Sequence, residues 1–203
     1  PLVDRRLRKA LALATNKKEI VDHVVRLGNP VADTFVPRDQ IRGYRSPRGL
    51  GFAPEQARAL LAEAGYPDGQ GLPVIEFFYN TGFNQEAIAQ AIKRIWEREL
   101  NIRVQLVGKE TKTFAEDKTM HRFMVARGGW FGDYLDPTTF LDLFRSESGH
   151  NSAGFKDEKY DGMLNEAGRE INPGKRMDML TEAERYLVEE QAPVVPIHTY
   201  VLV

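Results

Sequence analysis

Residues 125–137 read VARGGWFGDYLDP and overlap an apolar run at 123–126 that predicts a β-strand. Paired glycines at 128 and 129 let the backbone approach whatever lies at the end of that strand. The stretch also carries a cation, a large aromatic residue and two carboxylates, namely Arg127, Trp130, Asp133 and Asp136. Alternate side chains there would reach one crevice, which indicates a ligand site. The alternative is that Trp130 is a core residue and Arg127 pairs with Asp133 or Asp136.

The sequence around this stretch predicts an α/β order of elements. Two helices are expected at the start, one over residues 5–14 with Asp4 as its N-cap and one after a capping box at 16–19. Further helices are expected over 54–64, around 88–96, around 114 and over 173–190. Strands are expected over 74–79, 102–106, 123–126 and 194–203. A long surface loop is expected at 28–53. The β-α-β-α-β order in the middle predicts a mixed sheet flanked by helices with some parallel pairing. Without an internal repeat or a domain-splitting linker, residues 1–203 are expected to form a single lobe.

Composition excludes several classes of function. The 203 residues carry 28 Lys and Arg against 29 Asp and Glu, so there is no basic field for nucleic acid. The absence of Cys removes disulfides and thiol nucleophiles. The four His residues lack the spacing of a zinc site, so no metal site is expected, and His198 is expected to be a structural histidine with satisfied hydrogen bonds. No hydrolase elbow or phosphate-binding glycine motif is present, so no cofactor is expected.

The two carboxylates of the stretch have different sequence contexts. Asp136 precedes Pro137 and is expected to be the N-cap of a helix at 138–144. Asp133 follows Gly132, and Trp130 and Tyr134 would give it apolar surroundings in which a ligand ammonium group would bind well. Acid and base catalysis by the two carboxylates is the alternative from another class of function.

Four segments, in order, resemble the large C-terminal lobe of oligopeptide-binding proteins, in the peptide/nickel family of ABC importer solute-binding proteins. They are residues 7–14 with the following helix, ARALLAEAGYPDG at 57–69, GWFGDY at 129–134 and PVVPI at 193–197. The resemblance covers nearly the whole chain. It implies one lobe of a bilobed periplasmic-binding-protein fold, with the signal peptide, the first lobe and the final return segment outside residues 1–203.

The resemblance also implies roles for individual residues. Asp133 would take the α-amino group of a peptide, with Trp130 and Tyr134 beside it. Arg127 and Lys118 would receive the peptide carboxylate, although Lys118 offers a point charge in place of a guanidinium fork. Gln85 stands where related proteins have a histidine, which leaves the preferred peptide length open.

The implied protein is a non-enzymatic, periplasmic or extracytoplasmic monomer, free or lipid-anchored at full length, that delivers peptides to the membrane subunits of an ABC importer. Other solutes of the same fold remain alternatives, namely a dipeptide, a nickel chelate, haem or a sugar. Two alternatives from other classes of function also remain. One is an enzyme that acts on a small substrate with Asp133 and Asp136, and the other is a purely structural lobe.

Overall fold

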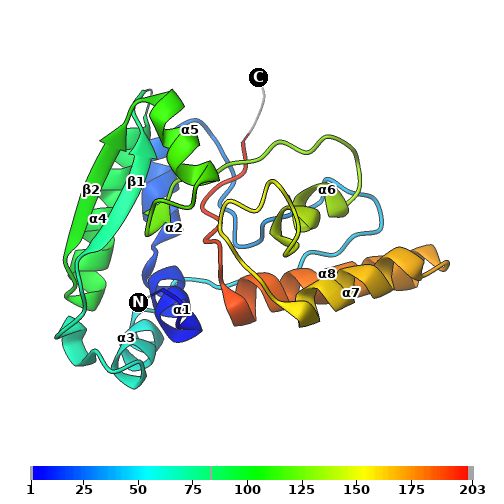
Figure 1. Cartoon of the computed structure of the whole chain (residues 1–203), viewed down its shortest axis with the longest axis horizontal. Coiled ribbons are helices and arrows are strands. Elements are labelled where there is room, and N and C mark those ends of the chain that lie inside the picture. Colours follow the sequence, from blue (N-terminus) through cyan, green and yellow to red (C-terminus); the bar gives the residue numbers. More distant parts are fainter. Residues whose placement is uncertain (1, 83, 201–203) are drawn as a thin grey trace. The chain divides into compact units, whose positions relative to one another are not determined.

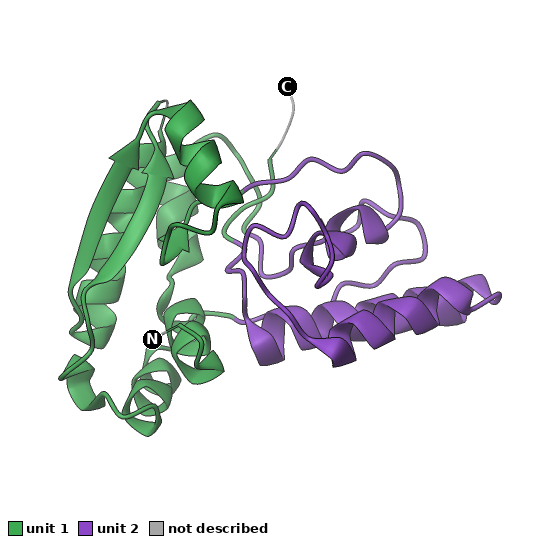
Figure 2. Cartoon of the chain, in the orientation of Figure 1, with its two compact units in different colours: residues 1–31, 51–128, 197–203 green, residues 32–50, 129–196 purple. Residues whose placement is uncertain are grey.

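The computed structural model describes residues 2–82 and 84–200, and these form two compact units. The first unit comprises Pro1–Val31, Gly51–Gly128 and Ile197–Val203, and the second comprises Ala32–Leu50 and Gly129–Pro196 (Figure 2). The α/β class is confirmed. The prediction that residues 1–203 make one lobe of a larger protein stays a prediction.

The first unit is built on a parallel sheet in the order β2-β1-β3. Strand β1 (Ile75–Asn80) is central and pairs in parallel with β2 (Val104–Lys109) and β3 (Val125–Ala126). Parallel neighbours need long crossovers, and the helices α4 (Gln85–Leu100) and α5 (Thr111–Thr119) provide them. Figure 1 shows α4 running along β1 and β2. The named strands are therefore parallel, where a mixed sheet was expected, and β3 is shorter than the expected 123–126.

Apart from a 3₁₀ turn at 67–69, which was not predicted as a helix, the remaining helices of the first unit begin where the sequence predicts. They are α1 (Arg5–Ala14), α2 (Lys17–Ile20), which continues as the π-helical η1 (Val21–Val25), α3 (Pro54–Glu63) and the short η2 (Pro67–Gly69). The Asp4 carboxylate accepts the Arg6 N–H at 2.8 Å, and the Asn16 side chain accepts the Glu19 N–H at 3.1 Å. Both predicted N-caps are confirmed.

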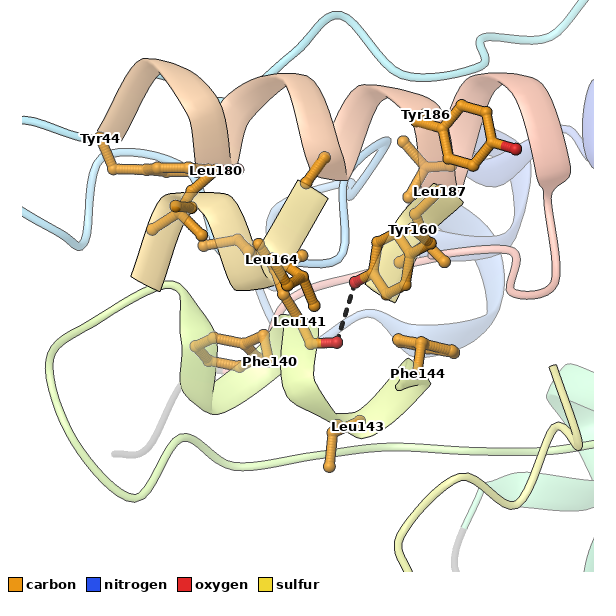
Figure 3. Packing of buried hydrophobic residues seen from close by; sticks show 14 of the residues in the cluster. Tyr44, Phe140, Leu141, Leu143, Phe144, Tyr160, Leu164, Leu180, Tyr186 and Leu187 are labelled. Atoms are coloured by element: carbon orange, nitrogen blue, oxygen red, sulfur yellow. Dashed lines mark hydrogen bonds between the residues drawn. The ribbon is translucent and has the colours of Figure 1, made fainter. Parts of the chain in front are cut away.

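The second unit consists of short helical turns packed on a pair of longer helices. It contains α6 (Thr138–Leu141), the 3₁₀ turn η3 (Asp142–Phe144), α7 (Glu158–Arg169) and α8 (Pro173–Arg185), which continues as the π-helical η4 (Tyr186–Gln191). Helices α7 and α8 lie side by side (Figure 1). Their facing side chains form a core with those of α6, and Figure 3 shows Tyr160 within it, donating from its hydroxyl to the Leu141 carbonyl at 2.8 Å.

A fully buried carboxylate joins the segment 32–50 to α8. Glu184 is 0% exposed, and one of its oxygens accepts the backbone N–H groups of Phe35 and Val36, each at 2.7 Å. Its other oxygen accepts the hydroxyl of Tyr44, which is itself buried. The segment expected to be a surface loop is thus partly core, because its backbone donors and Tyr44 are tied to a buried acid.

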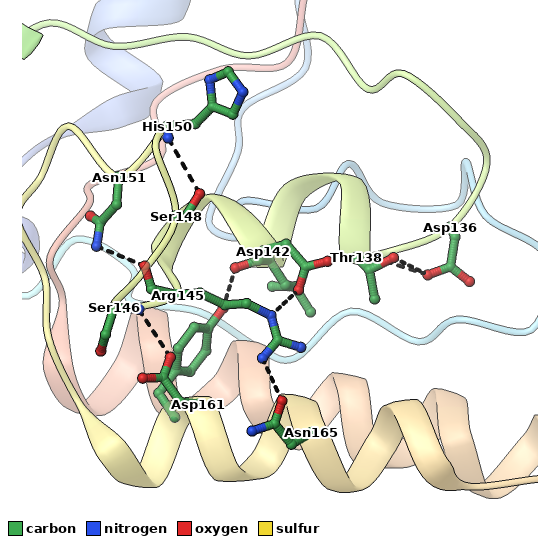
Figure 4. A network of polar contacts seen from close by, with 12 residues as sticks. Asp136, Thr138, Asp142, Arg145, Ser146, Ser148, His150, Asn151, Asp161 and Asn165 are labelled. Carbon is green, nitrogen blue, oxygen red and sulfur yellow. Dashed lines mark hydrogen bonds and ion pairs between the residues drawn. The ribbon is translucent and has the colours of Figure 1, made fainter.

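A polar network connects the turn after η3 to α7 (Figure 4). The Arg145 guanidinium donates to Asp142 at 2.5 Å and to Asn165 at 2.9 Å. The Asp161 carboxylate accepts the backbone N–H of Ser146 at 3.0 Å. These bonds hold the irregular chain that follows η3 on the helix pair.

The expected final strand is wrong for the residues that the structure describes. Of residues 194–200, only His198 makes a β-bridge, antiparallel to Val31, and residues 201–203 lie outside the described part. Pro196 has no N–H to donate to a ladder, which breaks the apolar run. Among the described residues, no helix has the length and apolarity to cross a membrane.

Candidate functional site

The residues expected to bind ligand are divided between the two units, because the boundary falls between Gly128 and Gly129. Gln85, Lys118 and Arg127 lie in the first unit, and Trp130, Asp133 and Tyr134 lie in the second. The prediction that they share one crevice stays a prediction, and each group is described within its own unit.

Arg127 lies at the carboxyl ends of the parallel strands. Its backbone N–H donates to the Phe78 carbonyl at 2.8 Å, which extends the pairing of β3 with β1 by one bond. Its guanidinium donates to the Tyr200 hydroxyl at 2.5 Å and to the side-chain oxygen of Asn80, the last residue of β1, at 3.4 Å. Ligands of α/β sheets bind at this edge, so Arg127 is well placed to meet an anion.

Lys118 lies near the C-terminal end of α5 and is half-buried. Its ammonium is 5.7 Å from the centroid of the Phe114 ring. Burial, and to a smaller degree the charge of Arg127, lowers the pKa of Lys118. Neither Lys118 nor Arg127 forms an ion pair with a carboxylate in the described part of the chain. Two cations that influence each other and lack a counter-ion make a suitable environment for an anionic group.

Gln85 is the first residue of α4 and is half-buried. Within residues 2–82 and 84–200, its side-chain amide has no hydrogen-bond partner. The structure therefore neither joins Gln85 to the two cations nor assigns its amide another use, and its ligand role stays a prediction.

His198 differs from its sequence interpretation. Its Nδ1 atom is buried and has no hydrogen-bond partner among the described residues, so the expectation of a satisfied structural histidine is wrong. Its ring packs edge-on against Tyr200, with centroids 5.0 Å apart. Burial, and then the charge of Arg127, lowers the pKa of His198. The position of a histidine inside an apolar segment was the only signal in the sequence.

In the second unit, Trp130 is partly a core residue. Its ring packs against the hydrophobic cluster around α7 and α8 and lies 5.2 Å from the His150 ring. Its indole nitrogen is buried and has no acceptor among the described residues. A buried Trp N–H usually has a partner, so this donor is an exception that the described residues do not explain.

Asp133 is exposed and is fixed through its backbone. Its N–H donates to the Thr139 hydroxyl at 2.9 Å, while its carboxylate forms no hydrogen bond or ion pair within the described residues. Tyr134 is also exposed, with its hydroxyl 3.4 Å from that of Thr138. The Asp133 carboxylate is therefore available to a ligand cation.

Asp136 has the opposite environment. One of its oxygens accepts the Thr138 N–H at 3.0 Å and the Thr138 hydroxyl at 2.7 Å, and the Arg176 guanidinium donates to both oxygens at 3.0 and 2.7 Å. Burial acts to raise the Asp136 pKa, but the bonds from Arg176 and Thr138 outweigh it and hold the pKa below its usual value. The carboxylate of Asp136 binds a backbone N–H at the helix start, as predicted, but the N-cap residue of α6 is Pro137 and not Asp136. Within its own unit, Asp136 forms an ion pair with Arg176.

No group of three or more metal-ligating His, Asp or Glu side chains occurs among the described residues. The chemistry that the structure offers is instead charge recognition: an unpaired carboxylate in the second unit and two uncompensated cations in the first.

Comparison with known proteins gives a consistent result. Residues 1–152 match the family described as bacterial extracellular solute-binding proteins, family 5, middle. The periplasmic oligopeptide-binding protein OppA of Escherichia coli (strain K12) is 34% identical over 207 residues, which cover 99% of this chain and 38% of that protein.

Solved structures agree with this match. A periplasmic oligopeptide-binding protein of Borrelia burgdorferi superposes with a TM-score of 0.91 at 33% identity, over 98% of this chain and 40% of that one. Haemophilus influenzae OppA, solved in complex with the peptide RPPGFSPFR, gives a TM-score of 0.89 at 30% identity, over 98% of this chain and 40% of that one. The chain spans well under half the length of these proteins. It belongs to the bacterial extracellular solute-binding proteins of family 5.

Proposed function

We propose that this chain is one lobe of a two-lobed extracytoplasmic protein that binds peptides and delivers them to an ABC importer. The observation that carries the proposal is that the chain leaves charges of both signs unpaired: the Asp133 carboxylate on one unit and the Arg127 and Lys118 cations on the other. A free peptide carries one ammonium and one carboxylate group. The oligopeptide-binding relatives support the same class of ligand.

In this proposal Asp133 receives the peptide α-ammonium group. The Thr139 hydroxyl fixes the Asp133 backbone, and the Trp130 ring would line the site beside it. Arg127 and Lys118 receive the carboxylate, with Arg127 held by Asn80 and Tyr200. A charge-assisted hydrogen bond is typically worth about 1.5–3 kcal/mol, so each of these contacts matters for affinity.

Catalysis by Asp133 with Asp136 has less support. Arg176 and Thr138 occupy the oxygens of Asp136 and keep its pKa low, so this residue is a poor general acid. The family itself is one of binding proteins.

The test is a double cycle in calorimetry with the two-lobed protein that carries this chain. Asp133→Asn should weaken a peptide with a free amino terminus by roughly one to two decades. N-acetylation of the peptide should weaken binding to the parent by a similar factor, with little further loss when both changes are combined. Asp178→Asn is the matched control, because Asp178 is an exposed acid on α8 of the same unit.

Coupling between the two changes supports the proposal. If the losses simply add, Asp133 does not hold the amine. If Asp178→Asn weakens peptides as much as Asp133→Asn, the effect belongs to the net charge of the protein and the assignment of Asp133 is wrong.

A further inference from the structure

A buried imidazole nitrogen without a partner lies in the same unit as the two uncompensated cations. His198 Nδ1 is buried and makes no hydrogen bond with the described residues, and the His198 ring packs on Tyr200. Tyr200 in turn accepts from the Arg127 guanidinium at 2.5 Å. A continuous chain of contacts therefore links the imidazole to the cation at the carboxyl end of β1.

Among the described residues, the backbone partners of His198 and Thr199 include no acid. The β-bridge places Val31 opposite His198, and the neighbouring Asn29 and Pro30 bond to Thr199. None of these three residues titrates. Arg127 is the charged group that acts on the imidazole, and it also acts on Lys118. Tyr200 is the titratable group in contact with the ring.

We infer that His198 takes up a proton when a ligand carboxylate binds to Arg127, so that capture of the carboxylate is coupled to proton binding. This inference rests on the proposed function, because it assigns a regulatory residue to the carboxylate end of the peptide. The only bond that forms in the protein is the N–H bond of the imidazolium, and the proton comes from solvent.

The coupling follows from charge balance. Without a bound carboxylate, burial and then the charge of Arg127 oppose a positive charge on His198. A bound carboxylate neutralises Arg127 and removes its repulsion of a charged imidazole, which favours imidazolium. Thermodynamic linkage is reciprocal, so protonation of His198 strengthens carboxylate binding by the same factor.

The expected effect is measurable within a narrow pH range. The ligand carboxylate stays ionised above about pH 5, and the peptide amine stays protonated below about pH 7, so neither group titrates between these limits. One pKa unit corresponds to roughly tenfold in affinity. A peptide with a free carboxylate should therefore bind about two- to fivefold more tightly at pH 5.5 than at pH 7.

The test follows the His198 ring signal by NMR in the two-lobed protein between pH 5 and pH 7, with tri-, tetra- and penta-alanine as probes and with their C-terminal amides. The signal is assigned by its loss in His198→Gln. The free acids should raise the His198 pKa by about half a unit to one unit, while the amides should leave it unchanged. In calorimetry, His198→Gln should bind the free acids with equal affinity at pH 5.5 and pH 7. His23→Gln is the matched control, because His23 is exposed on η1 of the same unit, and it should retain the parent pH dependence.

The possible outcomes separate the inference from the proposed function. If the free acids bind in calorimetry but the His198 signal titrates as in the free protein, the inference is wrong and the proposed function stands. Equal shifts with the acids and the amides also overturn it, because the carboxylate would then play no part. If none of the probes binds, the proposed function fails and the inference fails with it. In calorimetry, the free acids should bind more tightly at pH 5.5 than at pH 7 and the amides equally at both. This comparison needs no substitution and no assigned signal, so it remains decisive even where His198→Gln fails to fold.

Discussion

At the scale of single residues, Glu184 makes the stability of the second unit depend on pH. Burial raises the pKa of this carboxyl to about 7, against an ordinary value of 4.5, although Tyr44 and the two backbone donors act to lower it. Because the folded-state pKa lies above the unfolded one, the folded protein binds this proton more tightly. The stabilisation is fully present below about pH 4.5 and is lost as the pH rises through about 7.

Urea denaturation should therefore show the free energy of unfolding falling between pH 5 and pH 8, by up to about 3 kcal/mol from this residue. Glu184→Gln should remove most of that dependence, because the amide does not titrate, yet its oxygen can still accept the Phe35 and Val36 N–H groups. Glu182→Gln is the control, since Glu182 is an exposed acid on the same helix that pairs with Arg185. An identical pH slope in Glu184→Gln and the parent contradicts this account.

The sequence predicted some residue roles and missed others for identifiable reasons. Asp136 before Pro137 marks a helix start, and its carboxylate does cap Thr138. Glu184 was missed although it lies four residues after Leu180 and three before Leu187, on a stripe that is otherwise apolar. A charged residue on a buried stripe is the signal that could have found it. Its partners come from residues 35–44, and local periodicity does not identify such distant contacts.

At the scale of elements, Asp136 and Arg176 connect α6 to α8. Each side chain is about one quarter exposed, and two hydrogen bonds of 2.7 and 3.0 Å join them. Asp136→Asn loses the charge and one acceptor while Arg176 remains partly buried, which should cost about 1–3 kcal/mol of unfolding free energy in urea denaturation.

The same substitution separates structure from ligand binding. Asp136→Asn should change peptide affinity much less than Asp133→Asn does, because its carboxylate is already occupied within the second unit. The exposed Asp178→Asn should alter stability by less than about 0.5 kcal/mol and serves as control. If Asp136→Asn loses as much peptide affinity as Asp133→Asn and keeps its stability, the structural role given to Asp136 is wrong.

Elements with local signals were predicted well, and those that depend on a distant partner were not. The caps at Asp4 and Asn16, the strands around 75 and 104 and the long helix from Pro173 follow from periodicity and capping chemistry. The apolar segment 194–200 carries the composition of a strand but makes only the bridge at His198, because composition does not specify which backbone will pair with it. The shortness of β3 has the same cause.

At the scale of the whole molecule, the chain spans about 38% of the length of its E. coli relative. In the proposed two-lobed protein a ligand is enclosed from both sides, whereas residues 1–203 alone leave half of its contacts to water. In calorimetry, the isolated chain should therefore bind peptides at least about tenfold more weakly than the two-lobed protein. In light scattering, it should be a monomer. Equal affinities contradict the two-lobe account.

The most direct test of the central claim is mass spectrometry of the small molecules released from the two-lobed protein after purification without denaturant. The account predicts that the parent releases peptides with free amino and carboxyl termini. The Asp133→Asn variant should release far fewer peptides, and Asp178→Asn should release as many as the parent. Recovery of a nickel chelate, haem, a sugar or a turnover product in place of peptides would contradict it.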